Sequence, residues 1–188
     1  VVFAEPSAPE SDGYFAEAIS MAENVILASD LTAVDDGFMS GVIETRPFID
    51  FEEAGARVGL AGVEQDNDRV IRYFPSFEVT LSSVAAQMDE VPSDRSRIIN
   101  YIGEDHSFNY LSYYQFFLED GIEQGAVENK YVLIGLDVKA TPDVQQSQVD
   151  AFPTPHTRFN ARLSPGVEVH ANMLHNMLNE SWIVNPSI

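Results

Sequence analysis

Cysteine is absent from this chain of 188 residues, and basic residues are scarce. Without cysteine, neither a disulfide framework nor a thiolate metal site can form. Lysine and arginine together number 10 against 30 aspartate and glutamate residues, which gives a formal net charge of −20. Such a negative field repels nucleic acid and anionic membrane surfaces, so nucleic-acid binding is excluded as a function.

Long apolar runs are also missing. No stretch of 18 or more apolar residues is present, so the printed sequence contains no transmembrane helix. It has neither an initiator methionine nor a signal peptide, and residues 1–4 are typical of the middle of a buried strand. We therefore expect residues 1–188 to be a single domain cut from a longer protein.

The residues that are present favour a folded α/β domain. Hydrophobic residues make up 45% of the chain, enough to bury a core. Short apolar runs alternate with stretches of helical periodicity. Apolar residues 24–28 and 131–136 predict buried strands, and residues 57–63, 70–77 and 98–102 predict others. The expected fold is a mainly parallel sheet with helices on both faces.

A helix is predicted to begin at Ser164-Pro165. Ser164 can cap its free N–H groups, Pro165 suits the first helical position, and Glu168 favours the positive end of the dipole. This helix, residues 167–179, lies nearest the C-terminal exit, and we expect it to be the output lever of a receptor.

The two faces of this helix differ in composition. The periodicity places His170 on the core-facing side and Asn172 and Asn176 on the opposite side. A histidine on an apolar face is most often a hydrogen-bonded core residue. A pH- or ligand-sensing role is the alternative, because burial readily moves a histidine pKa.

Patterns that carry catalysis or bind metals are missing. Asp66-x-Asp68 resembles the start of a calcium loop, but an apolar and a basic residue occupy the next alternate positions. There is no Gly-x-Ser-x-Gly elbow and no identifiable base with an orienting partner. We assign no catalytic residue, no metal site and no cofactor, and expect that this domain is not an enzyme.

Several short segments follow one another in a recognisable order. They are VFAEP (2–6), AEAI (16–19), NVIL (24–27), VG (58–59), DNDRVIR (66–72), YIG (101–103), KYVLIG (130–135), FPTP (152–155) and GVEVHAN (166–172). Together they resemble the type-two CHASE domain family over nearly the whole chain. One departure is Asp68-Arg69, where family members usually carry Asp-Gly.

The resemblance implies an extracytoplasmic, periplasmic sensor domain of a bacterial transmembrane receptor in the inner membrane. Flanking transmembrane helices would anchor it. The cytoplasmic output would be a nucleotide cyclase such as an adenylate cyclase, a kinase of the two-component or serine/threonine type, or a diguanylate cyclase. The partner would be a small-molecule or physical stimulus. Since such outputs generally need two copies, the intact receptor is expected to be a homodimer, although self-repulsion opposes association of the isolated domain.

The family domain also opens with a strand and a helix ahead of the segment that matches residues 1–6. We expect the sheet to lack that strand unless it is supplied elsewhere. A second class of function stays open: a secreted or periplasmic hydrolase that uses carboxylates from the acidic surplus.

A ligand site is predicted where strands end in polar loops, because ligands of parallel α/β sheets bind at the carboxyl ends of strands. The loops after residues 102 and 135 could converge, and the unpatterned stretch 139–163 could close over them. The alternative is that Asp150 and Thr154 brace this stretch onto the body. The candidate contacts are Asp105, His106, Asp137, Thr141, Asp143, Asp150, Thr154 and His156.

Overall fold

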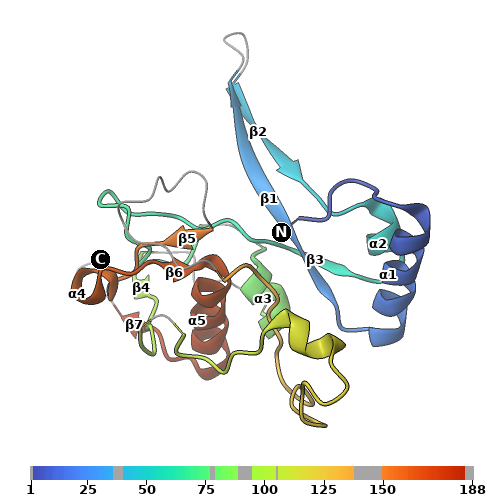
Figure 1. Cartoon of the computed structure of the whole chain (residues 1–188). Coiled ribbons are helices and arrows are strands. Elements are labelled where there is room, and N and C mark those ends of the chain that lie inside the picture. The colour runs from blue at the N-terminus through green and yellow to red at the C-terminus, as the bar shows by residue number, and fades with distance from the viewer. Residues whose placement is uncertain are drawn as a thin grey trace.

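The computed structural model describes residues 2–35, 40–76, 79–88, 95–104, 106–137 and 150–184. Helices and short strands alternate along these residues, which confirms the predicted α/β class (Figure 1). Two hydrophobic clusters form, one around the N-terminal elements and one around the last helix.

The N-terminal elements are α1 (Pro9–Ala22), β1 (Ile26–Asp35), β2 (Ser40–Thr45), α2 (Ile49–Glu53) and β3 (Arg57–Leu60). The strands form one sheet in the order β2-β1-β3, in which β1 is antiparallel to β2 and parallel to β3. The first four residues of β1 pair with β3, and the last six pair with β2. The sheet is therefore mixed, and only β1 joins its two halves.

The cluster beside this sheet is built from one residue of each neighbouring element. Ile19 of α1, Leu27 of β1 and Phe51 of α2 are almost fully buried together with Ala56. Phe15 packs edge-on against Phe51, with ring centroids 4.9 Å apart. The apolar stripe of α1 thus docks the helix onto the start of β1.

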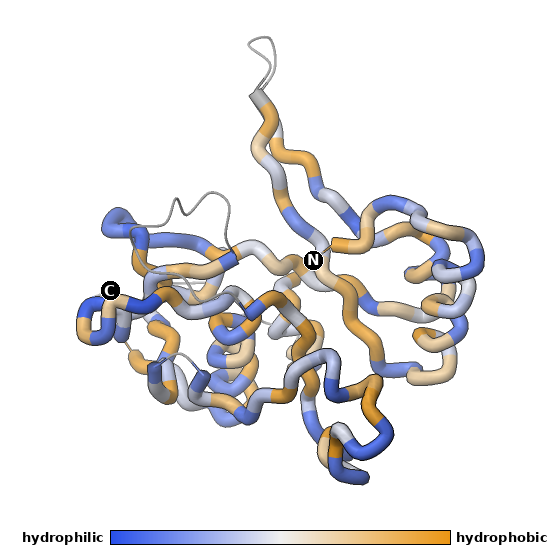
Figure 2. The backbone as a smooth tube through the Cα atoms, in the orientation of Figure 1, coloured by the Kyte–Doolittle hydropathy of each residue, from blue (hydrophilic) through white to orange (hydrophobic). Residues whose placement is uncertain are grey.

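The outer part of β1 and β2 forms a two-stranded arm that projects from the rest of the molecule (Figure 1). Hydrophobic stretches colour the tube along this arm (Figure 2). Val42 and Ile43 are exposed there, although they lie on opposite faces of the ribbon. The arm therefore buries neither face against the body.

The remaining elements are shorter. They are α3 (Leu81–Ala86), β4 (Arg97–Ile98), the 3-10 helix η1 (Tyr113–Phe117), β5 (Ala151–Phe152), α4 (Thr157–Asn160), β6 (Ser164–Pro165), α5 (Gly166–Asn179) and β7 (Ile183–Val184). β4 pairs with β7 and β5 pairs with β6, both antiparallel.

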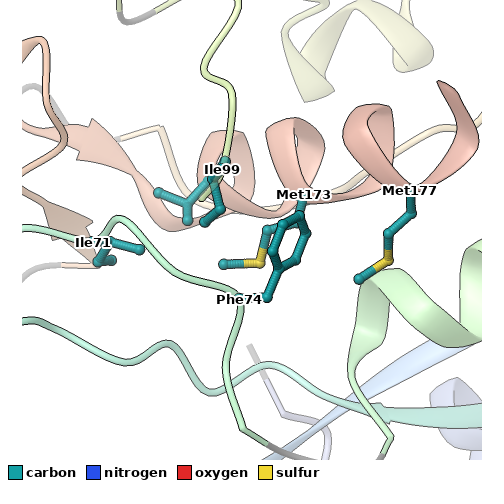
Figure 3. Close-up of a cluster of buried hydrophobic side chains, with 6 residues drawn as sticks. Ile71, Phe74, Ile99, Met173 and Met177 are labelled. Atoms are coloured by element: carbon teal, nitrogen blue, oxygen red, sulfur yellow. The ribbon is translucent and has the colours of Figure 1, made fainter. Parts of the chain in front are cut away.

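The second cluster covers one side of α5. Val169, Met173 and Met177 follow one another at four-residue spacing, and each is almost fully buried. Figure 3 shows Phe74 beside Met173, with Ile71 and Ile99 on the same side of the helix. This spacing places the three α5 side chains on one stripe, which is the core-facing stripe of the helix.

α3 links the end of β3 to α5. Thr80 caps it in a reciprocal capping box with Ser83, and a parallel bridge links Thr80 to Leu60 at the end of β3. Gly59 makes this approach possible, because a β-carbon there would lie 2.6 Å from Leu81 Cα. On the other side of α3, Ser82 Oγ donates to the carbonyl oxygen of His170 at 3.2 Å.

The expectation of a mainly parallel sheet covered on both faces is not confirmed. Among the described strands only β1 and β3 form a parallel ladder, and the other three ladders are antiparallel. Predicted strand 70–77 makes a single antiparallel bridge, Tyr73 to Ile98, and the predicted strand 98–102 is represented only by β4. Apolar character predicted buried extended chain there, but not which neighbour would pair with it.

The prediction of a strand at residues 131–136 is wrong. In the described part of the chain no strand pairs with this run, and most of its side chains are exposed. A strand needs a neighbour to satisfy its backbone groups, and an apolar composition alone does not provide one.

The turn before residue 70 explains the departure at Asp68-Arg69. Arg69 has a φ of 66°, a left-handed conformation that glycine adopts without steric cost. Arg72 Nη2 donates to Asp68 Oδ2 at 2.6 Å, and this bond lowers the pKa of Asp68 to about 2. The turn therefore keeps its shape with a residue less suited to it than glycine.

Replacing Gly59 by alanine tests the junction between β3 and α3. The added methyl group meets the backbone of Leu81, which cannot move away as a flexible side chain would. We expect Gly59→Ala to lower the free energy of unfolding by about 1–3 kcal/mol, measured by urea denaturation. Gly13→Ala is the matched control: position 13 lies in open space within α1, so the same change should be stabilising by about 0.5–1 kcal/mol.

Candidate functional site

The helix that carries the candidate site does not start at Pro165, the predicted first helical position. α5 begins at Gly166, Pro165 is the N-cap, and no side chain caps it. The expectation that Ser164 caps the helix is therefore wrong. Ser164 instead pairs with Phe152 between β6 and β5, and its hydroxyl lies 3.4 Å from Thr154 Oγ1.

The first turn of α5, residues 166–168, contacts three segments that are distant in the sequence. Gly135 lies so close to Val167 that a β-carbon on Gly135 would be 2.6 Å from Val167 Cβ. Ser107 N donates to Glu168 Oε1 at 2.8 Å. Gly166 N donates to Asp150 O at 3.1 Å. The ends of the predicted ligand loops therefore meet at this turn.

Two of the predicted contact residues face each other. His106 Nε2 lies 3.1 Å from the Asp137 carboxylate, and the His106 ring packs edge-on against Tyr110. His106 has a φ of 64°, so its loop turns sharply at this residue. A histidine and a carboxylate at this distance form a polar pair that a proton or a polar ligand can reach.

The other predicted residues are dispersed. Asp150 lies over Gly166, where its carboxylate occupies the space that a side chain at position 166 would need. Thr154 is buried, and its N–H donates to Thr157 Oγ1 at 2.9 Å. His156 packs against the Tyr101 ring, 6.5 Å between centroids. The burial of Thr154 and its hydrogen bond to Thr157 fit the alternative in which Thr154 fixes its own segment to the body. The ligand role of Asp150, Thr154 and His156 stays a prediction.

Three further predictions, Asp105, Thr141 and Asp143, lie outside the described residues. Among the residues that are described, no group of three or more histidine, aspartate or glutamate side chains is arranged to hold a metal ion.

Two buried amides of α5, Asn172 and Asn176, form an amide ladder with the chain after β4. Asn100 N donates to Asn176 Oδ1 at 2.7 Å, and Asn176 Nδ2 donates to Asn100 O at 2.9 Å. One turn earlier, Ile102 N donates to Asn172 Oδ1 at 3.1 Å. The expectation that these asparagines face away from the core is wrong, because their side chains substitute for a neighbouring strand.

The signal that could have revealed the amide ladder is its spacing. Glu168, Asn172 and Asn176 recur every four residues, so they lie on one stripe of the helix, and each of them bonds to the segment of residues 100–107. A polar stripe on a helix is usually exposed to water. Periodicity alone does not distinguish such a stripe from one that bonds to a neighbouring backbone.

His170 is buried, as predicted, on a different stripe of the same helix. Its Nε2 donates to the carbonyl oxygen of Ala61 at 3.0 Å, and its buried Nδ1 has no partner within the described structure. Burial lowers the pKa of His170, while its bond to Ala61 and the charge of Asp150 act in the opposite direction. The ring is therefore held neutral, with its proton on Nε2.

These features describe an α/β domain in which loops converge on one buried helix. The family model of the CHASE2 domain matches residues 1–188, so the chain belongs to the CHASE2 family. CHASE2 domains are extracellular sensor domains of signalling receptors. Searches of curated proteins and of solved structures return no match.

Membership in a sensor family gives no support to the hydrolase alternative. None of the helices in the described ranges is both long and apolar enough to cross a membrane.

Replacing Asn176 by alanine tests the amide ladder. The change leaves the N–H and C=O of Asn100 without their partners, and we expect a loss of about 1–3 kcal/mol in the free energy of unfolding. The measurement is urea denaturation followed by circular dichroism. Asn179→Ala removes an exposed amide of the same helix and should change stability by less than about 0.5 kcal/mol. Equal losses for both variants would contradict the ladder.

The burial of His170 predicts a pH dependence. Below a pH near 6.5, the pKa of an ordinary histidine, the unfolded chain gains a proton that the folded chain resists. This contribution to stability is complete above that pH and is lost as the pH falls toward the lower pKa of the folded state. Melting temperatures should therefore fall between about pH 7 and pH 5.

A His170→Gln variant should show a flatter profile over the same range, because glutamine can donate to Ala61 O without titrating. His175→Gln, on a more accessible side of α5, is the control and should keep the wild-type profile. Parallel profiles for wild type and His170→Gln would show that another group causes the dependence.

Proposed function

We propose that residues 1–188 form one extracytoplasmic signal-input domain of a bacterial transmembrane receptor and that α5 transmits the signal. Membership in the CHASE2 family supports the sensing role. The observation that carries the role of α5 is the meeting of three distant segments on its first turn. A change in any of these segments must be accommodated by the same helix.

α5 is also held along its length. The amide ladder ties one side of it to residues 100–102, and Met173 and Met177 lock another side into the core. On a third side the backbone of His170 accepts from Ser82 of α3. Packed interiors resist gradual deformation, so such a helix shifts between discrete positions.

The mechanism is a population shift between two positions of α5. A stimulus that binds one of them better favours it by the difference in binding free energy, and about 5.5 kcal/mol would reverse a 1:99 ratio. In the proposed ligand site the first contact is the His106–Asp137 pair. Its sequence neighbours Ser107 and Gly135 contact the first turn of α5. Asp150 is the second contact, beside Gly166.

The receptor in this proposal is a homodimer in the bacterial inner membrane, with the domain in the periplasm. Its cytoplasmic output is a cyclase, a kinase or a diguanylate cyclase, since each of these acts on a signal received across the membrane. The sensor itself has no catalytic role.

Site-specific labelling tests the placement of the domain. Because the domain has no cysteine, a single introduced cysteine reports its own exposure. Tyr14→Cys, at an exposed position of α1, should react in intact spheroplasts with a maleimide that cannot cross the inner membrane. The receptor used would have any cysteine outside residues 1–188 replaced.

Ile71→Cys is the matched control, because position 71 is fully buried and should react only after denaturation. If Tyr14→Cys reacted only after the inner membrane was permeabilised, the domain would be cytoplasmic and the proposal would fail.

A further inference from the structure

The carboxylate of Asp150 lies on the same stripe of α5 as His170. Gly166 and His170 are four residues apart in the helix, so they lie one turn apart on one side of it. Gly166 has no side chain, and a β-carbon there would overlap Asp150 Oδ1. The carboxylate therefore occupies the place of the side chain one turn before His170, where neighbouring β-carbons are about 5–6 Å apart.

The ring of His170 has one nitrogen without a partner. Nε2 donates to the carbonyl oxygen of Ala61 at 3.0 Å, whereas Nδ1 is buried and has no hydrogen-bond partner among the described residues. His170 is only 7% exposed, so bulk water does not supply the missing partner. A neutral imidazole nitrogen of this kind can accept a proton, and it then becomes a donor that needs an oxygen.

The carboxylate of Asp150 can provide that oxygen. In the part of the chain that the structure describes, the bond to Asp150 runs from Gly166 N to its backbone oxygen, and no hydrogen bond or ion pair engages the carboxylate. The charge of Asp150 favours the protonated form of His170. A carboxylate and an imidazolium form one of the stronger hydrogen bonds found in proteins.

The other groups around His170 do not replace Asp150. α3, whose Ser82 donates to the backbone of His170, consists of uncharged residues. Arg57 of β3 donates to the carbonyl oxygen of Val84, and Glu168 accepts from Ser107 on another stripe of α5. The charge of the chain's amino terminus opposes protonation. Asp150 is thus the acidic side chain that favours a proton on His170.

We propose that His170 Nδ1 and the Asp150 carboxylate form a proton-binding site, in which one proton joins the segment before β5 to α5 through an ion pair. The step forms an N–H bond on Nδ1 and leaves the bond from Nε2 to Ala61 intact. The charged ring then holds the end of β3 and the start of β5 at once.

Burial opposes the charged ring, so the site fills only below the pH at which an ordinary histidine titrates. The ligand is the proton, and the quantity that the site reports is the acidity around the domain. Only the use of this report as a signal rests on the proposed function.

NMR titration of the His170 ring in the 188-residue chain, between about pH 8 and pH 4.5, tests the site. We expect His170 to titrate with a pKa below the usual value of about 6.5. Asp150→Asn removes the charge and keeps the shape, and should lower that pKa by at least about 0.5, an about threefold loss of proton affinity. Gly166→Ala should lower it as well, because its methyl group displaces the carboxylate while both partners remain.

Two controls separate this pair from the general charge of the chain. Asp120→Asn removes the same charge from an exposed position and should leave the pKa of His170 unchanged. Acetylation of the amino terminus removes the opposing charge, and the effect of Asp150→Asn should persist in the acetylated chain.

The backbone amides give a second readout. The signals of Ala151 and Gly166 should shift with the midpoint of His170 in the wild type. They should not do so in His170→Gln, which can keep the bond to Ala61 but does not titrate.

Four results would overturn the proton site. They are a ring that stays neutral down to pH 4.5, a pKa unchanged by Asp150→Asn or by Gly166→Ala, an equal fall in Asp120→Asn, and amide shifts that persist in His170→Gln. The membrane placement would stand in each case, because cysteine labelling tests it separately.

Discussion

The structure depends on buried backbone groups that side chains satisfy. The chain after β4 leaves its two-residue strand and runs beside α5, where no described strand pairs with it. The amide ladder of Asn172 and Asn176 provides hydrogen bonds to its backbone instead. An unsatisfied buried amide is costly, so this arrangement ties the position of the loop to the rotation of the helix. The core, the ladder and the His106 loop are consequently parts of one assembly.

The α/β fold class could be predicted from the sequence, but little of the strand pairing could. Apolar periodicity correctly indicated an α/β domain and the burial of His170, because these follow from local spacing. Pairing depends on neighbours that are distant in sequence. Residues 70–76 and 131–136 show this, because neither run forms a ladder with another described segment. Arg69 shows the converse, since the glycine usual in the family marked a left-handed residue.

The candidate site, too, could be predicted from the sequence only in part. The predicted loop ends do meet, through the contacts of His106 with Asp137 and of Asp150 with Gly166. The parallel strands from which this meeting was inferred do not lie before these loops in the described residues. Thr154 and His156 lie in separate surroundings that no spacing rule indicates. The role of Asn172 and Asn176 could not be predicted, because a polar stripe that contacts water and one that bonds to a backbone have the same sequence pattern.

The continuity of β1 has a mechanical consequence. Its first four residues are paired in the body with β3, and its last six leave the body with β2 alone. Six residues of strand reach about 20 Å, and no turn or hinge separates them from Leu27 in the core. Because one strand runs through both the arm and the α1–α2 cluster, a displacement of the arm's outer end is passed along β1 to that cluster.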